Sequence, residues 1–217
     1  MVLICGVEEA GRGPVIGPMV VCGVLIDKSK EHELAEMGVK DSKLLTPKQR
    51  EELFSKIGKV AEDFCIDIVK PKEIDRAVIG DESNLNWLTA DKFIQVINTL
   101  KPDIAYVDCP STNTRAFLVY LSERILSEKT KLVVENKADK NYVVVGAASI
   151  MAKVTRDREI EKIKRKYNIE FGSGYPADPF TKQFLVNNYN KYPIFRESWA
   201  SWKNVAKQGG QRKLNQF

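Results

Sequence analysis

Short apolar runs alternate along the chain with longer amphipathic stretches. The apolar runs have the length and the Val and Ile content of buried strands, which predicts strands at residues 2–7, 18–26, 60–69, 104–107 and 132–135. Capping residues and prolines around the amphipathic stretches predict helices at residues 47–59, 83–100, 113–126, 142–166 and 198–207, and a further helix that starts at Asp178-Pro179. This order of elements predicts an α/β fold whose sheet mixes antiparallel and parallel pairs.

Gly172 and Gly174 mark a break after the last of these alternating strands and helices. We therefore expect a sheet domain over residues 1–170, a small helical extension over residues 171–207 and a flexible polar tail over residues 208–217. With 217 residues, of which 43% are hydrophobic, the chain is long enough to bury a sizeable core.

The composition narrows the function without fixing it. The formal charge of +5 permits a polyanionic partner but does not require one. No apolar run is long enough to cross a bilayer, and the first apolar run ends in carboxylates, unlike a secretion signal. We therefore expect a cytoplasmic protein without a membrane partner.

Cysteine and histidine usage argues against several kinds of site. The four cysteines form no CxxC pair and lie in or at the end of strand-like runs, which predicts buried reduced thiols rather than a zinc site. His32 is the only histidine, which argues against a histidine triad or a multi-histidine metal site. Acid–base chemistry would therefore fall to carboxylates, lysine, tyrosine or metal-bound water.

Two aspartates follow predicted strands of the second half. Asp108 comes directly after the run at residues 104–107, at the carboxyl end of a strand, where ligand sites lie in open α/β sheets. Asp139 follows the run at residues 132–135. Each also has a purely structural interpretation, because Asp108 is a common turn residue that can cap the next helix and Asp139 is placed to cap the helix after it.

Glu8 and Glu9 end the first predicted strand. Regular strand geometry would point their side chains to opposite faces, but Gly11 can end the regular pairing and turn both inward. A solvated strand end is the alternative. Together with Asp108 and Asp139, however, they offer oxygen ligands that suit Mg²⁺ or Mn²⁺, and two such ions about 4 Å apart can activate a water for phosphodiester cleavage.

Six sequence blocks together resemble type 2 ribonuclease H, most closely the archaeal form of that family. In chain order they are GVEEAGRGPVIGP at residues 6–18, VKDSKLLTP at 39–47, NLNWL at 84–88, VDCPSTN at 107–113, ENKADKNYVVVGAASIMAKVTRDR at 135–158 and GSGYPADP at 172–179. The resemblance covers nearly the whole chain. It implies an RNase H-like mixed five-stranded sheet flanked by helices, with a small C-terminal helical extension.

The resemblance also implies a metal-dependent endonuclease that cuts RNA in RNA–DNA duplexes and single ribonucleotides embedded in DNA. Such enzymes cut on the 5′ side of the ribonucleotide and leave 3′-hydroxyl and 5′-phosphate ends. A type 3 ribonuclease H, which cuts hybrids but not lone ribonucleotides, is a more distant alternative. It is disfavoured because no extra N-terminal domain precedes the first predicted strand.

The family's metal-binding carboxylates correspond to Glu8, Glu9, Asp108 and Asp139, which implies a site for two Mg²⁺ or Mn²⁺ ions. Glu8 departs from the family pattern, in which the first acidic residue is aspartate. Its extra methylene shifts a carboxylate that bridges the metals, and catalysis is sensitive to such shifts. We therefore expect reduced activity or an altered metal preference, and the alternative is a catalytically weakened protein that binds embedded ribonucleotides.

The resemblance further implies residues that contact the substrate. The loop of Gly11, Arg12 and Gly13 would approach the 2′-hydroxyl of the ribonucleotide, the group that distinguishes RNA from DNA. Tyr175 would lie at the RNA–DNA junction, bonding the 2′-hydroxyl while its ring stacks under the next deoxyribose. Phosphate contacts would come from three further residues, Lys43, Ser149 and Lys153.

The last residues resemble a truncated sliding-clamp-binding peptide. Gln211, Leu214 and Phe217 have its spacing, although the full motif has two adjacent aromatic residues. A Leu/Phe pair on a flexible tail can fill a preformed pocket, and a chance match in a polar tail is the alternative. Nothing in the sequence requires assembly, so we expect a monomer.

Overall fold

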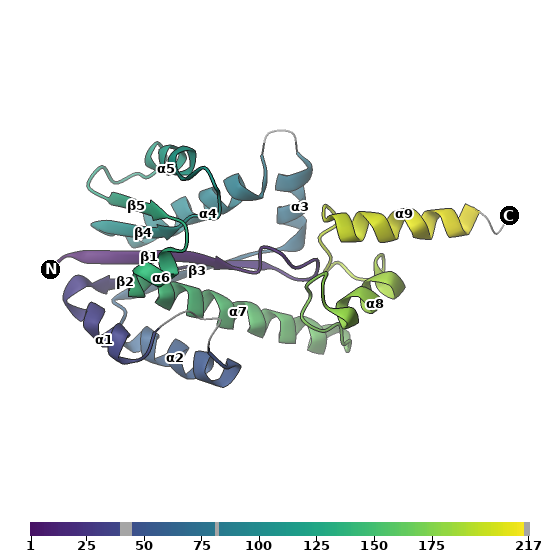
Figure 1. Ribbon diagram of the computed structural model, residues 1–217, viewed down its shortest axis with the longest axis horizontal. Coiled ribbons are helices and arrows are strands. Elements are labelled where there is room, and N and C mark those ends of the chain that lie inside the picture. The colour runs from purple at the N-terminus through teal and green to yellow at the C-terminus, as the bar shows by residue number, and fades with distance from the viewer. Residues whose placement is uncertain (40–44, 81–82, 215–217) are drawn as a thin grey trace. The chain divides into compact units, whose positions relative to one another are not determined.

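The computed structural model of the protein describes residues 1–39, 45–80 and 83–214, with side chains up to residue 209. A five-stranded sheet has the strand order β3-β2-β1-β4-β5 (Figure 1). The strands are β1 Leu3–Ala10, β2 Met19–Asp27, β3 Asp63–Val69, β4 Ile104–Asp108 and β5 Lys131–Glu135. Strand β1 pairs antiparallel with β2 and parallel with β4, and β4 pairs parallel with β5, which confirms the predicted mixed sheet.

The helices of the described residues are α1 Glu31–Glu36, α2 Pro47–Val60, α3 Pro71–Ile79, α4 Leu85–Leu100, α5 Thr114–Ser122, α6 Ala138–Asn141, α7 Val143–Tyr167, α8 Pro179–Asn188 and α9 Ala200–Leu214. The residues predicted to start α2 and α8 form helix caps in the structure. Thr46 and Gln49 form a capping box at α2, and the Asp178 side chain accepts from the Phe180 amide at α8. The sequence analysis did not predict α1, α3 or α6.

Several predicted bounds were wrong. Helix α2 continues to Val60, so β3 begins only at Asp63. Helix α5 ends at Ser122 instead of residue 126, and Leu126 is 83% exposed, so no burial favours a longer helix. Helix α9 continues to Leu214 instead of ending at residue 207, so the backbone is helical through most of the segment expected to be a flexible tail.

Contacts divide the chain into two compact units, each assembled from three segments. Unit 1 comprises Met1–Ala10, Val20–Ile68 and Asn86–Thr155, and unit 2 comprises Gly11–Met19, Val69–Leu85 and Arg156–Phe217.

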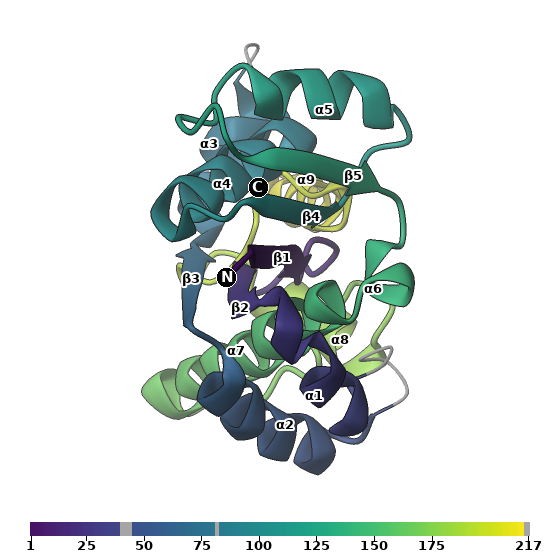
Figure 2. The ribbon, with the colours of Figure 1, turned by 90° about the vertical axis from the view of Figure 1, so that its left-hand side faces the viewer.

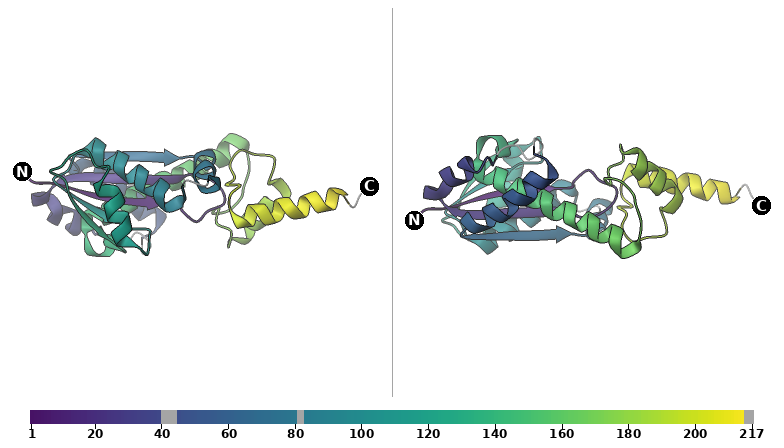
Figure 3. Two further views of the ribbon diagram at one scale, coloured as in Figure 1. Left: turned by 90° about the horizontal axis from the view of Figure 1, so that it is seen from above. Right: turned by 90° about the horizontal axis from the view of Figure 1, so that it is seen from below.

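Unit 1 contains the sheet with helices on both faces. Its main apolar cluster packs β1 and β2 against α1, α2 and the first part of α7 (Figures 1 and 2). Seen from below, α2 and α7 lie across these strands (Figure 3). The start of α7 approaches β1 so closely that a side chain at Gly6 would collide with the Val144 backbone. On the opposite face, Val96 and Leu100 of α4 pack over Gly23 of β2.

Unit 2 has its own apolar cluster around Ile16, Phe171 and Phe195. A β-bridge joins Ile16 to Phe195, so the 11–19 segment is tied to the chain that precedes α9. Helices α8 and α9 meet where Trp202 Nε1 donates to the Tyr189 carbonyl over 2.9 Å, and Gly209 lies against the Tyr189 ring. This packing accounts for the extension of α9 past residue 207.

Candidate active site

Asp108 ends β4 at the carboxyl end of a parallel strand, as the sequence predicted. Its Oδ1 atom accepts from the Ala138 amide over 3.0 Å, which joins the strand end to the start of α6. The alternative that Asp108 caps the following helix is wrong, because Asn113 caps α5 by accepting from the Ala116 amide. Asp108 is therefore directed towards the segment that carries Asp139.

Asp139 lies in the first turn of α6, where Lys137 occupies the N-cap position without a side-chain cap bond. Lys137 has a φ of 60°, a left-handed conformation that is unusual for a non-glycine residue and is often found at functional sites. Asp139 therefore lies inside the first turn of α6 and is not its N-cap.

A network that the sequence analysis missed fixes the segment around Asp139. Asn136 Nδ2 donates to the Cys109 and Ser111 carbonyls over 2.7 and 2.8 Å. Glu135 accepts from the Tyr142 hydroxyl over 2.7 Å and from Asn141 Nδ2 over 3.0 Å, and these bonds lower the pKa of Glu135. The only signal available in the sequence was that all of these donors and acceptors lie in or beside recognised blocks.

Glu8 is buried, with 7% of its surface exposed. Its carboxylate, with those of Asp108 and Asp139, offers ligand atoms that all lie within 4.8 Å of one another. Burial raises the pKa of Glu8 well above its usual value, and the charges of Glu9 and Asp108 raise it further. Like charges at this spacing, one of them buried, favour a divalent cation, and the all-oxygen donor set fits Mg²⁺ or Mn²⁺.

Glu9 does not belong to this group of three. Regular pairing of β1 with β2 continues through Ala10, opposite Val20, so Gly11 does not interrupt the pairing beside the two glutamates as expected. Glu9 nevertheless lies close enough for its charge to act on Glu8.

The second group of predicted residues assembles within unit 2. Gly11 has a φ of +84°, a conformation that glycine adopts without strain. A side chain at Gly13 would lie 3.3 Å from the Tyr175 ring, so this ring packs directly against the loop. Tyr175 remains 39% exposed. The structure therefore brings Gly13 and Tyr175 together on the surface of this unit, whereas Gly11 is buried at the start of the same loop.

Two arginines that were not predicted as site residues support this group. Arg156 donates from Nη2 to the Ser173 carbonyl over 2.7 Å, and its guanidinium lies 5.4 Å from the centre of the Tyr175 ring. Arg196 has no exposed surface and donates to carbonyls of the 11–17 loop. Arg156 lies within the recognised block at residues 135–158, whereas Arg196 lies outside every block.

Two of the remaining predicted residues lie on α7. Ser149 is buried and Lys153 is half-buried, and the two are one turn apart on α7. Lys43 and Phe217 lie outside the described residues, and only the backbone is described at Gln211 and Leu214, within α9.

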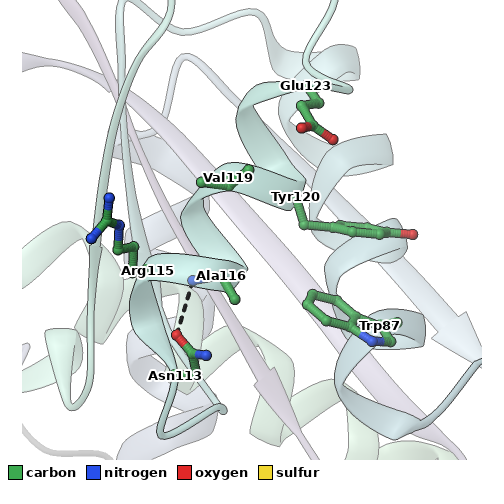
Figure 4. Close-up of a pocket in the computed structure, with 7 residues that line it drawn as sticks. All are labelled: Trp87, Asn113, Arg115, Ala116, Val119, Tyr120 and Glu123. Atoms are coloured by element: carbon green, nitrogen blue, oxygen red, sulfur yellow. Dashed lines mark hydrogen bonds between the residues drawn. The ribbon is translucent and has the colours of Figure 1, made fainter.

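A separate cavity of about 400 Å³ lies between α4 and α5 (Figure 4). Trp87 stacks on Tyr120 there with ring centres 4.6 Å apart. Asn113, which caps α5, also lines the cavity. Trp87 and Asn113 come from two of the recognised blocks. Here the Trp87 ring joins α4 to α5, whereas Asn113 caps α5.

A sheet of this strand order, with carboxylates from β1, β4 and α6 gathered together, is the arrangement of an RNase H-like hydrolase. The family model described as Ribonuclease HII matches residues 5–204, and the chain belongs to the ribonuclease HII family. The protein is therefore an endoribonuclease of the ribonuclease H class, a class that uses divalent metal ions. In the described residues, no helix has the length and apolar content needed to cross a membrane.

Relatives and solved structures agree with this assignment. Ribonuclease HII of Pyrococcus abyssi is 44% identical over 217 residues, an alignment that covers 97% of this chain and 94% of the relative. The crystal structure of ribonuclease H2 from Pyrococcus horikoshii superposes with a TM-score of 0.88 at 44% identity, covering 95% of this chain and 98% of the other. The ribonuclease HII in a PCNA complex from Archaeoglobus fulgidus has a TM-score of 0.83 at 38% identity and covers 91% and 95%.

Proposed function

We propose that this protein cleaves RNA in RNA–DNA duplexes and single ribonucleotides embedded in DNA, on the 5′ side of the ribonucleotide, leaving 3′-hydroxyl and 5′-phosphate ends. The observation that carries the proposal is the approach of Glu8, Asp108 and Asp139 ligand atoms to within 4.8 Å of one another. Family membership supports the type 2 specificity over the type 3 alternative.

In this proposal Glu8, Asp108 and Asp139, with Glu9 beside them, hold two Mg²⁺ or Mn²⁺ ions. When bound, these ions supply water activation and charge stabilisation at the scissile phosphate. The protein's part is to fix the carboxylates: β4 places Asp108, and the bonds of Asn136 and Glu135 hold the segment that carries Asp139.

The substrate would be read by Gly11, Arg12 and Gly13 at the 2′-hydroxyl and by Tyr175 at the junction. The packing of the Tyr175 ring against Gly13 supports one shared surface for both contacts. The phosphate contacts would come from Lys43, Ser149 and Lys153.

A direct test is incubation with a labelled duplex that contains one ribonucleotide, in Mg²⁺ or Mn²⁺. We expect a single cut on the 5′ side of the ribonucleotide, and end-group analysis identifies the 3′-hydroxyl and 5′-phosphate. Tight binding without product would favour the alternative, a catalytically weakened protein that binds embedded ribonucleotides.

An E8D variant measures how much the longer side chain of Glu8 slows cleavage. We expect this variant to cleave faster than the wild type and to show a changed ratio of its activity in Mg²⁺ to its activity in Mn²⁺.

We further propose that Gln211, Leu214 and Phe217 bind a sliding clamp. The PCNA complex of the Archaeoglobus fulgidus relative supports this partner. Calorimetric titration of a clamp with the full chain and with a chain that ends at residue 210 tests it, and equal affinities would reject the tail as the binding element.

We also expect the free protein to be a monomer, and light scattering should give the mass of a monomer.

A further inference from the structure

Arg196 is the largest side chain in the described residues with essentially no exposed surface. A buried guanidinium is costly unless its N–H groups are bonded. Three of its nitrogens donate to backbone carbonyls of the same loop: Nε to Gly17 over 3.0 Å, Nη1 to Arg12 over 2.8 Å and Nη2 to Gly11 over 2.7 Å. One side chain therefore binds both ends of the 11–17 loop.

These bonds fix the orientation of two peptide planes. In a trans peptide the carbonyl and the following N–H point in opposite directions, and the described residues contain no cis peptide. The Gly11 and Arg12 carbonyls point towards Arg196, so the N–H groups of Arg12 and Gly13 point away from it. The buried arginine thus sets the direction of the two donors in the Gly-Arg-Gly sequence.

Further contacts hold Arg196 and the loop together. Trp199 places its ring 4.9 Å from the Arg196 guanidinium carbon and donates from Nε1 to the Gly13 carbonyl over 3.0 Å. Asp75 of α3 accepts from the Glu197 amide at 2.9 Å and from the Ser198 amide and hydroxyl at 2.9 and 2.5 Å, which fixes the backbone beside Arg196.

The charge state of Arg196 allows it to donate all of these hydrogen bonds to the 11–17 loop. Burial lowers the pKa of the guanidinium to about 9, with a further contribution from the charge of Arg156, and Asp75 and Tyr175 act in the opposite direction. The side chain therefore stays protonated at neutral pH and keeps all of its donors. Charged donors make stronger hydrogen bonds than neutral ones.

We propose that Arg196, assisted by Trp199, is a positioning residue for ribonucleotide discrimination, which acts by directing the Arg12 and Gly13 amides towards the 2′-hydroxyl. This inference rests on the proposed function of the loop and adds the device that orients it. Arg196 itself, having no exposed surface, does not touch the substrate.

The test measures binding, so that loss of catalysis does not obscure it. Affinities are determined in Ca²⁺ for two duplexes of one sequence, one all-DNA and one with a single ribonucleotide. The variants are R196K, which keeps the charge but has one donor nitrogen, and W199F, which keeps a ring but loses the bond to Gly13. R50K is the matched control, because Arg50 is also buried and donates to a backbone carbonyl, that of Leu45, within unit 1.

We expect the wild type and R50K to bind the ribonucleotide duplex more tightly than the DNA duplex. In R196K this ratio should fall by about tenfold, or about 1.4 kcal/mol, with unchanged affinity for the DNA duplex. W199F should show a smaller fall and serves as the test if R196K does not fold.

Each outcome decides the proposal. An unchanged ratio in a folded R196K or W199F overturns the inference while leaving the proposed function intact, and so does an equal loss of affinity for both duplexes. A wild type that binds the two duplexes equally overturns the proposed reading of the 2′-hydroxyl by the loop, and this inference with it, whereas the cleavage assay tests the proposed activity separately.

Discussion

At the scale of single residues, the candidate active site places a buried carboxylate close to other carboxylates of the same charge. Glu8 is almost fully buried beside two other carboxylates, and this burial, together with the neighbouring negative charges, raises its pKa well above the usual value. Such an arrangement reduces stability unless a cation compensates it, so it is more consistent with a ligand site than with a structural role.

Asp139→Asn tests the metal-binding role of the carboxylate cluster, because it replaces one carboxylate oxygen by an amide nitrogen. The amide keeps the shape of the side chain but removes a charge that would bind metal, so we expect cleavage to slow by roughly 10³-fold or more, about 4 kcal/mol of transition-state stabilisation. Single-turnover rates on the one-ribonucleotide duplex measure this. Glu128→Gln removes an exposed carboxylate between α5 and β5 and should leave the rate unchanged. A near-normal rate in the Asp139 variant would refute the assignment.

Tyr175→Ala tests whether this residue recognises the RNA–DNA junction of the substrate. The ring packs against Gly13 and is proposed to contact both the 2′-hydroxyl and the next deoxyribose, so its loss should reduce cleavage of a single embedded ribonucleotide more than cleavage of a long hybrid. We expect the ratio of the two kcat/KM values to change at least tenfold. Phe64, which is 40% exposed compared with 39% for Tyr175, gives a matched control in Phe64→Ala. Equal losses on both substrates would contradict the proposed contact.

At the scale of elements, the ends of strands and helices decide where the site residues lie. The sequence predicted every strand of the sheet, because apolar runs of strand length are a strong signal, and it placed Asp108 correctly at the end of β4. It did not predict α6, because four residues are too few to show a helical period. It therefore missed the network in which Asn136 and Glu135 position Asp139.

Asp178 shows how one element end supports the surface around Tyr175. Its carboxylate caps α8 and accepts from the Ser173 amide and hydroxyl, both over 2.7 Å, which lowers its pKa to about 2. A depressed pKa means that the carboxylate stabilises the fold fully above its unfolded pKa, near pH 4, and progressively less as the pH falls towards about 2.

Asp178→Ala should therefore lower the unfolding midpoint by a constant amount above about pH 4, and the difference from the wild type should shrink between about pH 4 and pH 2. Urea unfolding at several pH values measures it. Asn113→Ala removes the uncharged cap of α5 and provides the control, since its effect should not follow this pH dependence. A difference for Asp178→Ala that stays constant down to pH 2 would show that its charge does not matter.

At the scale of the whole molecule, the residues proposed for catalysis and for ribonucleotide reading belong to different units. The carboxylates lie in unit 1, whereas the Gly-Arg-Gly loop, Tyr175 and Arg196 lie in unit 2, and the chain passes from one set to the other between Ala10 and Gly11. Periodicity alone does not reveal this division, because each unit is assembled from three separate segments. The recognised blocks named residues of both sets, but Arg196 stands outside every block.

The net charge of +5 leads to a prediction for the binding of the chain to nucleic acid. Each phosphate that the protein neutralises releases counterions, so the logarithm of the affinity should fall by roughly 0.9 for each unit of log salt concentration per phosphate contact. Replacing Lys153 by alanine should weaken binding to all duplexes and reduce the slope by about one contact, whereas Lys129→Ala, on the exposed loop before β5, should leave it unchanged. Fluorescence anisotropy between roughly 50 and 200 mM salt covers a useful range of affinities. A flat salt profile, or equal slopes for the wild type and the Lys153 variant, would mean that this part of α7 does not contact the backbone of the duplex.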